Sequence, residues 1–446
     1  MAKKGLLKGA LILTAAGIIC RALGVLFRIP LSNIVGNYGI GLYQLVFPLY
    51  SLLLIISSAG IPVAISKMIA RVRDDPPACQ KIFFNALISL LVIGTVVTLL
   101  FLALAQPLAY WQGNPEIFSL YLAIAPAVAL VCVISAFRGY FQGLNNMVPT
   151  AVSQIVEQVV KVGVGLGLSF WLIQLSVVWA VFGAILAVSV SELVALVVLI
   201  VIYLVKVKPG RKTQPKPGKL FSWAVIKRIF VISAPIMAMS LAFPLVQLFD
   251  SFFVVNALRG NGIDHATELY GIESGAVHTL INLPSVVGVA LATVLLPMVS
   301  RFYKQERITE MKHKALPMVW LALGFGVVVT VVFCLLPEFI LNLLYHRAFA
   351  GKPAELATGV LLLRIESCAV PLICLTQVTG SILQGIDRAA WPMWALIVGG
   401  AGKVGLELAG IHGWGIMAVS IANVVCYAVA LAINLVAMIK FLRQRK

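Results

Sequence analysis

Apolar stretches long enough to cross a lipid bilayer recur along the whole chain of 446 residues. A transmembrane helix needs about 20 mostly apolar residues, and about twelve stretches meet this length. They lie at 10–34, 40–66, 83–107, 117–140, 150–174, 177–205, 225–257, 274–300, 316–345, 356–382, 391–411 and 413–439. Hydrophobic residues make up 61% of the chain and charged residues only 11%, which leaves no polar coat for a soluble domain. The sequence predicts an all-α polytopic membrane protein.

The distribution of positive charge predicts the orientation of these spans. The 34 Lys and Arg residues outnumber the 16 Asp and Glu residues and give a net charge of +18. About 26 of the 34 fall at the N-terminus, in even-numbered loops or at the C-terminus, and about three fall in odd-numbered loops. This pattern predicts that both termini are cytoplasmic and that acidic residues such as Glu273 belong to outer loops. Charge placed by membrane side does not indicate a nucleic-acid partner.

One hydrophilic segment divides the spans into two sets of six. "KVKPGRKTQPKPGKL", from Lys206 to Leu220, is rich in Pro, Gly and Lys, a composition typical of a solvated linker. The sequence therefore predicts an N-terminal lobe at 1–205, a basic cytoplasmic linker at 206–224 and a C-terminal lobe at 225–446.

The two halves share an ordered series of short matches. "YFQGLNNMVP" precedes Lys161 and "SILQGIDRAAWP" precedes Lys403, and the separation of Gln142 from Gln384 equals that of the two lysines. Further on, "GAILAVS" in the first half resembles "GIMAVS" in the second. Such a series predicts an internal duplication. Two lobes with six spans each have the same orientation in the membrane, an arrangement typical of transporters.

Several ionisable side chains lie inside the predicted spans. Each costs about 2.5–3.5 kcal/mol at the centre of a bilayer unless it faces protein or water. The basic candidates for a substrate-binding cavity are Arg21, Arg28, Lys161, Arg364 and Lys403, and the acidic candidates for charge balance or ion coupling are Glu157, Asp250 and Glu407. Glu157 with Lys161, and Lys403 with Glu407, are spaced for one helix face, so each pair is either a structural ion pair or part of the cavity.

Three longer stretches carry a family resemblance. They are "LKGALILTAAGIICRALGVLFRIPLSNIVGNYGIGLYQ", "SSAGIPVAISKMIA" and "RGYFQGLNNMVPTAVSQIVEQVVKV". The chain resembles, over essentially its whole length, the stage V sporulation protein B group of the multidrug/oligosaccharidyl-lipid/polysaccharide exporter superfamily. The resemblance implies two six-helix lobes around a central cavity and a role in cell-wall, spore or polysaccharide synthesis.

The same resemblance bears on particular residues. Arg21 lies in "RALG", which resembles the first-span R-x-L-G element of the flippases, whose arginine lines the cavity. The second span lacks the basic residues that the lipid II flippases carry there. The sequence predicts twelve spans where many relatives have about two more, which form part of a groove for the lipid tail, so the place of the tail is left open.

These observations together predict a flippase. It would move polyprenyl-diphosphate-linked glycan precursors, whether peptidoglycan, spore-cortex or polysaccharide units, from the cytoplasmic to the outer leaflet by alternating access. Arginine suits a diphosphate because its planar fork donates two parallel hydrogen bonds. The membrane potential, H⁺ or Na⁺ would drive the movement without a nucleotide or other cofactor. The expected partners are membrane lipids and the lipid-linked glycan, and the expected state is a monomer in the bacterial cell membrane.

Two alternatives remain at this stage. A cation-coupled multidrug exporter of the same superfamily would bind its ion at Asp250 or Glu157. A membrane enzyme acting on lipid-linked sugars would need reactive residues in an outer loop, and the longest predicted one, Leu258–Glu273, contains His265 without a nucleophile or a metal-ligand set. The seven cysteines have no C-x-x-C spacing. We therefore expect no catalytic residue and no metal site.

Overall fold

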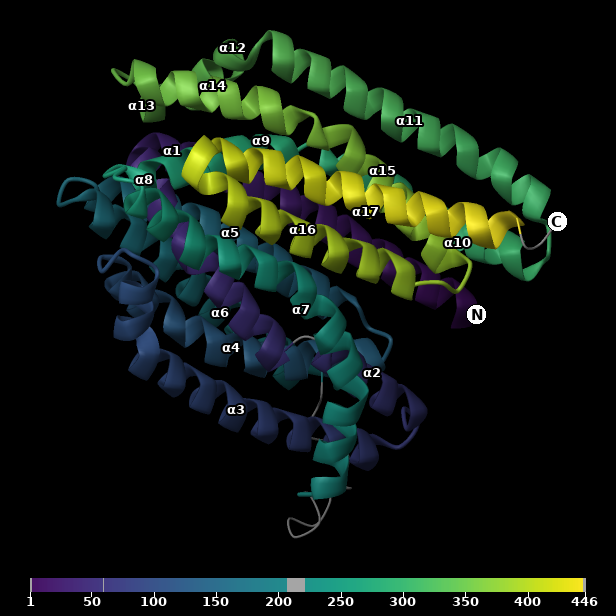
Figure 1. Ribbon diagram of the computed structural model, residues 1–446. Helices are drawn as coiled ribbons and strands as arrows, with labels where there is room; N and C mark the ends of the chain where they lie inside the picture. Colours follow the sequence, from purple (N-terminus) through teal and green to yellow (C-terminus); the bar gives the residue numbers. More distant parts are fainter. Residues whose placement is uncertain (1, 59, 207–220, 444–446) are drawn as a thin grey trace. The chain divides into compact units, whose positions relative to one another are not determined.

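The computed structural model describes residues 2–58, 60–206 and 221–443, and the regular structure of these residues is helical (Figure 1). Ten helices in this part of the chain are long and apolar enough to cross a membrane. One of them, Ile12–Arg71, holds the first two predicted spans. Helix α7 (Trp223–Gly260) covers the seventh. The prediction of an all-α membrane protein with about twelve spans is confirmed.

Two long helices contribute to two different compact units. The first unit comprises Met1–Ile34 and Leu45–Pro244, and the second comprises Val35–Gln44 and Leu245–Lys446. Helix α1 (Ala2–Ser58) therefore supplies residues to both units, as does α7. The helical backbone of α1 is interrupted at Gly36, where φ is 68° and ψ is −175°. The linker predicted at 206–224 falls largely on residues 207–220, which lie outside the described part, so its boundaries stay a prediction.

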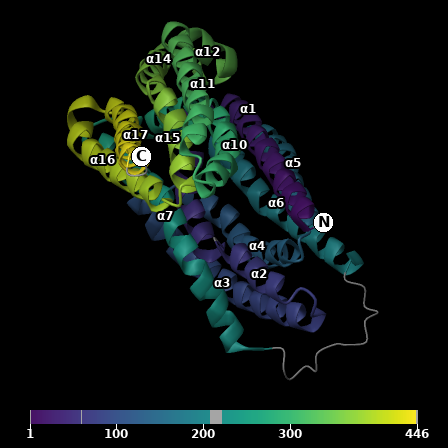
Figure 2. The ribbon, with the colours of Figure 1, turned by 90° about the vertical axis from the view of Figure 1, so that its right-hand side faces the viewer.

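The first unit is built around α4. Its helices after α1 are α2 (Ile61–Arg71), α3 (Pro76–Trp111), α4 (Ile117–Gly143), α5 (Val148–Leu172) and α6 (Val177–Lys206). Helices α2, α3 and α6 pack on α4, and α5 packs along α6 (Figure 2). Gly139 and Gly143 lie four residues apart on α4, and a Cβ atom there would come within 2.8 Å of Ile65 and 2.7 Å of Ile69. These glycines let α2 and α4 approach closely, as small residues do in membrane helices.

The second unit repeats this packing with more interruptions. Its elements after α7 are α8 (Ala266–Tyr270), the π-helix η2 (Gly271–Val277), α9 (His278–Asn282), α10 (Ser285–Lys304), α11 (Ile308–Leu335), α12 (Pro337–Leu344), α13 (His346–Phe349), α14 (Pro353–Ser367), α15 (Ala369–Gly385), α16 (Ala390–Trp414) and α17 (Met417–Arg443). Helices α10, α11 and α17 pack on α15, and α16 lies along α17 (Figure 1). Each contact has its counterpart in the first unit.

The turns that carry the repeated sequence also share one backbone conformation. Asn145, after α4, and Asp387, after α15, are both left-handed, with φ of 61° and 62°. The amide of Asn145 donates to the carbonyl of Gln142 at 2.9 Å, and that of Asp387 donates to Gln384 at 3.1 Å. Glu306 has the same conformation after α10, so the turn alone is common. The turns at Asn145 and Asp387 share more than this conformation, because each follows a Gln-Gly pair at the end of its helix. Together with the matching helix packing in the two units, this confirms the internal duplication.

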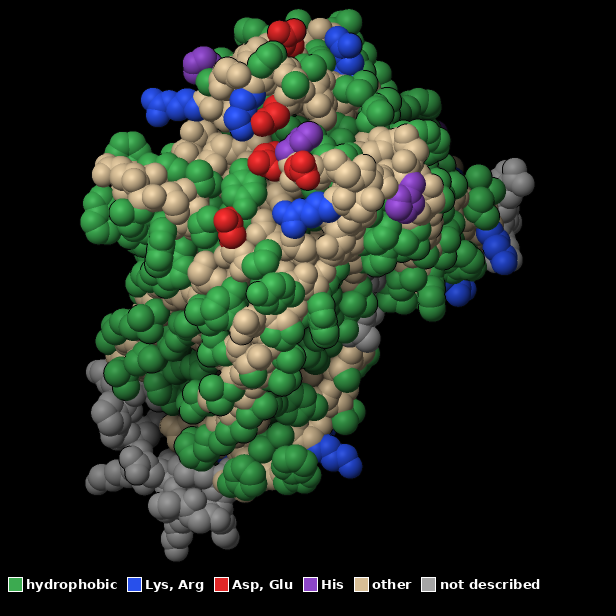
Figure 3. Space-filling model, turned by 60° about the vertical axis from the view of Figure 1, so that its left-hand side comes forward, with side chains coloured by type: hydrophobic (Ala, Val, Ile, Leu, Met, Phe, Trp, Pro, Cys, Tyr) green, Lys and Arg blue, Asp and Glu red, His purple; other side chains and the backbone are tan. Residues whose placement is uncertain are grey.

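The surface suits a hydrocarbon environment. Large apolar side chains are exposed along the long helices, among them Leu99, Trp171 and Leu335. On the face drawn in Figure 3, hydrophobic side chains are widespread, and most of the charged ones gather in its upper part. Contiguous exposed apolar area of this kind marks contact with lipid.

Candidate functional site

An ion pair joins α4 to α5 inside the first unit. Arg138 Nη2 lies 2.9 Å from Glu157 Oε2, and Arg138 Nε donates to Ser153 Oγ at 3.1 Å. Gln158 Nε2 donates to the other oxygen of Glu157 at 3.3 Å. The polar face predicted for the fifth span therefore exists, but Glu157 pairs with Arg138 rather than with Lys161. Of the two alternatives for Glu157 and Lys161, the structural ion pair between them is not formed, and the role of both residues in the cavity stays a prediction.

Lys161 lies in a different setting, one turn further along α5. Its Nζ lies 5.9 Å from the centre of the Phe27 ring, a cation–π distance. Arg28, Glu157 and Glu192 are near enough to Lys161 to act on its charge. Glu192 is buried on α6, and its Oε2 has no hydrogen-bond partner among the described residues. We call Arg138, Ser153, Glu157, Lys161 and Glu192 the N-terminal cluster.

The Arg138–Glu157 pair is expected to hold α4 and α5 together. Both side chains are largely buried, so removing one partner leaves the other charge without compensation. We expect a coupling energy of about 1–3 kcal/mol in a double-mutant cycle of Arg138→Met and Glu157→Gln, measured by thermal unfolding in detergent. The matched exposed pair Arg307–Glu310 is expected to give less than about 1 kcal/mol. Additive effects of Arg138→Met and Glu157→Gln would contradict this assignment.

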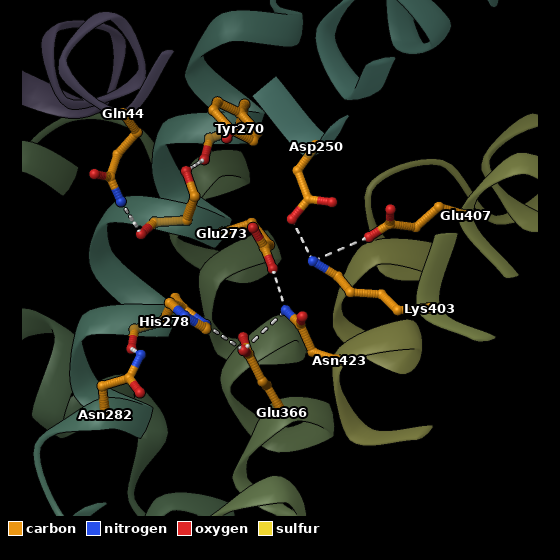
Figure 4. A network of polar contacts seen from close by, with 11 residues as sticks. Gln44, Asp250, Tyr270, Glu273, His278, Asn282, Glu366, Lys403, Glu407 and Asn423 are labelled. Carbon is orange, nitrogen blue, oxygen red and sulfur yellow. Dashed lines mark hydrogen bonds and ion pairs between the residues drawn. The ribbon is translucent and has the colours of Figure 1, made fainter. Parts of the chain in front are cut away.

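A buried triad lies in the second unit, between α7 and α16. Lys403 Nζ forms an ion pair with Asp250 Oδ2 and lies 3.5 Å from Glu407 Oε1 (Figure 4). All three residues are at most 8% exposed. The predicted Lys403–Glu407 pair is present, and Asp250 is added to it by the packing of α7.

A second group of buried side chains surrounds Asn423 of α17. Its Nδ2 donates to Glu273 Oε1 at 3.0 Å and to Glu366 Oε1 at 3.1 Å. The same oxygen of Glu366 lies 2.9 Å from His278 Nδ1. These residues come from η2, α9, α14 and α17, and Figure 4 shows them converging near the triad. We call the triad and this group together the C-terminal network.

Two of the remaining predicted cations, Arg21 and Arg364, lie outside the ion pairs of the N-terminal cluster and the C-terminal network. Arg21 of α1 and Arg364 of α14 are exposed, and Arg28 is half-buried. Neither Arg21 nor Arg364 forms an ion pair within the described residues. Exposure in a membrane helix means contact with lipid or with water, and the role of these arginines in substrate binding stays a prediction.

Sequence reasoning missed several members of both groups. Glu273 was expected in an outer loop, but it is 3% exposed because helical structure starts at Ala266, before the apolar run begins. His278 and Asn423 carry no sequence signal strong enough to select them. Arg138 could have been selected from the sequence, because it is a charged residue within the predicted span 117–140.

The duplicated sequence places two of these residues at equivalent positions. Aligning "AVS" of Ala187–Ser189 with "AVS" of Ala418–Ser420 sets Glu192 opposite Asn423. Each is 6% exposed and each faces the ionisable residues of its own unit. The same helix position therefore belongs to a cluster of two cations and two carboxylates in one unit, and to a network of four carboxylates and one lysine in the other.

The fold defines the class: an all-helical, polytopic membrane protein with the architecture of the MATE transporters. A solved inward-facing multidrug resistance MATE family transporter of the MOP superfamily superposes with a TM-score of 0.74 at 16% sequence identity, covering 95% of each chain. The sequence pattern of the polysaccharide biosynthesis protein family matches residues 6–303, and the chain belongs to this family. The MatE family pattern matches residues 235–402.

Two curated bacterial proteins are similar over most of their length. Stage V sporulation protein B of Bacillus subtilis (strain 168) is 29% identical over 439 residues, which cover 95% of this chain and 82% of that protein. Lipid II flippase MurJ of the same strain is 26% identical over 417 residues, which cover 88% of this chain and 75% of that protein.

Proposed function

We propose that the protein is a flippase that moves polyprenyl-diphosphate-linked glycan precursors from the cytoplasmic to the outer leaflet by alternating access. The observation that carries the proposal is that Arg21, Lys161 and Arg364, all in membrane helices, have no carboxylate within ion-pair distance among the described residues. A cation in a span requires water or an anionic partner. The diphosphate of a lipid-linked sugar supplies such a partner, and the flippase named among the relatives supports this choice.

The charges suggest how movement is driven. Arg21 and Arg28 would hold the diphosphate through charge-assisted hydrogen bonds, with Lys161 adding positive potential. An inside-negative potential favours outward movement of each negative charge by about 2.3 kcal/mol per 100 mV, so a diphosphate gains about 4–5 kcal/mol if its charge crosses the whole field. This energy makes nucleotide hydrolysis unnecessary. The polyprenyl tail stays in hydrocarbon throughout.

Further parts of the proposal follow from the charge distribution and the relatives. Both termini are assigned to the cytoplasm by the positive-inside rule, and the chain is assigned to the bacterial cell membrane as a monomer. The relative named for sporulation supports a spore-cortex or peptidoglycan precursor as the glycan. No catalytic step is assigned.

One observation favours a second candidate. The MatE pattern matches residues 235–402, a region that contains three of the four carboxylates of the C-terminal network. An acidic network of this kind would suit export of organic cations coupled to a cation gradient. Arg21 and Lys161, which form no ion pair within the described residues, weigh against such a substrate.

The test is translocation of a fluorescent undecaprenyl-diphosphate-linked sugar in proteoliposomes. We expect the intact protein to move the labelled lipid to the opposite leaflet, where a membrane-impermeant quencher reaches it, and to do so faster under an imposed potential. Empty liposomes give the background. Absence of translocation together with uptake of ethidium, an organic cation, would overturn the proposal in favour of drug export.

A further inference from the structure

The C-terminal network carries more negative charge than its one lysine can balance. Its four carboxylates belong to Asp250, Glu273, Glu366 and Glu407, and each residue is at most 8% exposed. Lys403 is paired with two of them, Asp250 and Glu407. Glu273 and Glu366 remain, both bonded to the uncharged amide of Asn423. Buried charges cost several kcal/mol each unless they are paired, so this half of the network requires additional positive charge.

Four carboxylate oxygens of the network have no hydrogen-bond partner among the described residues: Asp250 Oδ1, both oxygens of Glu407, and Glu366 Oε2. The first three belong to the residues that are paired with Lys403, so Glu366 is the carboxylate at which the additional charge would be bound. Glu366 is 1% exposed, and its Oε1 contacts both His278 and Asn423. Its Oε2 has no hydrogen-bond partner among the described residues. A buried carboxylate oxygen without a donor is costly, and adding a proton to the carboxyl group removes both the charge and most of the cost.

The chemistry of the neighbours favours a proton over a metal cation. Sodium and other hard cations prefer several oxygen ligands. The groups that contact Glu366 are instead a histidine ring nitrogen and an amide nitrogen. His278 Nδ1 lies 2.9 Å from Glu366 Oε1, a distance over which a proton passes directly between them. The side chain of His278 is 19% exposed, against 1% for that of Glu366, so His278 is the more accessible of the two.

We propose that Glu366, with His278, Asn423 and Glu273, forms a proton-binding site, and that H⁺ is the coupling ion of transport. The coupling role rests on the proposed function, whereas proton binding does not. The charged and titratable groups that face the site from other elements are Tyr427 of α17, Tyr270 of α8, Lys403 and Glu407 of α16 and Asp250 of α7.

Proton binding is tested on the full chain in lipid nanodiscs. The number of protons taken up after a jump from alkaline to acidic pH is measured with an indicator dye, and the carbonyl band of protonated carboxyl groups is followed by infrared spectroscopy. We expect Glu366→Gln to lose about one proton per chain and the corresponding infrared band. Glu310→Gln, at an exposed ion-paired glutamate, is the matched control and is expected to keep the infrared band of the buried carboxyl group. Equal proton uptake in Glu366→Gln and the intact protein would overturn the proposal.

A second measurement does not depend on a variant that folds. Dicyclohexylcarbodiimide is an apolar reagent that modifies protonated carboxyl groups in membranes. We expect it to label Glu366 or Glu273 of the intact protein, as identified by mass spectrometry, and to label less at alkaline pH. Absence of label at both residues would count against the site as well.

Transport with separate gradients distinguishes this inference from the proposed function. If the lipid-linked sugar moves with a pH gradient and Glu366→Gln uncouples it, both are supported. If it moves with a sodium gradient and ignores pH, the flippase proposal stands and the proposal that H⁺ is the coupling ion falls. If protons bind but the lipid-linked sugar does not move, the coupling role and the flippase proposal fall while the proton-binding site remains.

Discussion

Replacing Arg21 and Arg28 together by alanine is expected to reduce translocation of a diphosphate-linked lipid by about 100-fold or more. Hydrogen bonds to charged groups contribute about 1.5–3 kcal/mol each, and two arginines would supply at least two of them. Both residues lie on α1 seven positions apart, so they share one side of the helix. The measurement is the initial rate of lipid translocation in proteoliposomes that contain equal amounts of folded protein.

The control for this prediction is Arg307→Ala. Arg307 is also an arginine, but it forms an exposed ion pair with Glu310 at the start of α11. We expect its replacement to leave the rate within about twofold of the intact protein, since exposed pairs contribute little. Full activity of the Arg21→Ala/Arg28→Ala variant would show that the substrate is bound elsewhere.

Replacing Lys403 by methionine is expected to destabilise the second unit by about 3–5 kcal/mol. Methionine keeps much of the length of the side chain but leaves Asp250 and Glu407 as buried carboxylates without their cation. The free energy of unfolding is measured by chemical or thermal denaturation in detergent. Because the cost comes from the stranded carboxylates, the triple variant Lys403→Met/Asp250→Asn/Glu407→Gln is expected to regain most of the lost stability.

The triple variant separates charge from packing. If it remained as unstable as Lys403→Met alone, the lysine would act through its contacts with neighbouring side chains rather than by charge. If Lys403→Met itself were as stable as the intact protein, the two carboxylates would have to be compensated by another group.

Hydropathy was sufficient to predict the spans, because the bilayer imposes one length and one polarity on every helix that crosses it. The Lys403–Glu407 contact was also predictable, since both residues lie on one helix at a spacing fixed by its geometry. The duplication could be read from "YFQGLNNMVP" and "SILQGIDRAAWP" because turns depend on local sequence.

Contacts between helices were not predictable in the same way. The partner of Glu157 is Arg138 of α4, and only the packing of α4 against α5 brings them together. Glu273 was expected in an outer loop because hydropathy detects where a helix becomes apolar, not where it begins. In the structure, α8 and η2 precede the apolar run, and Glu273 lies within η2. His278 and Asn423 become notable only when η2, α9, α14 and α17 are seen together (Figure 4).

The equivalent turns at Asn145 and Asp387 also bear on how the two units can differ. In a homodimer of identical subunits, a substitution at any position changes both subunits at once. One chain that contains both copies has no such constraint, and the position held by Glu192 in one copy is held by Asn423 in the other. The first unit can thus keep two cations with two carboxylates, while the second keeps four carboxylates with one lysine.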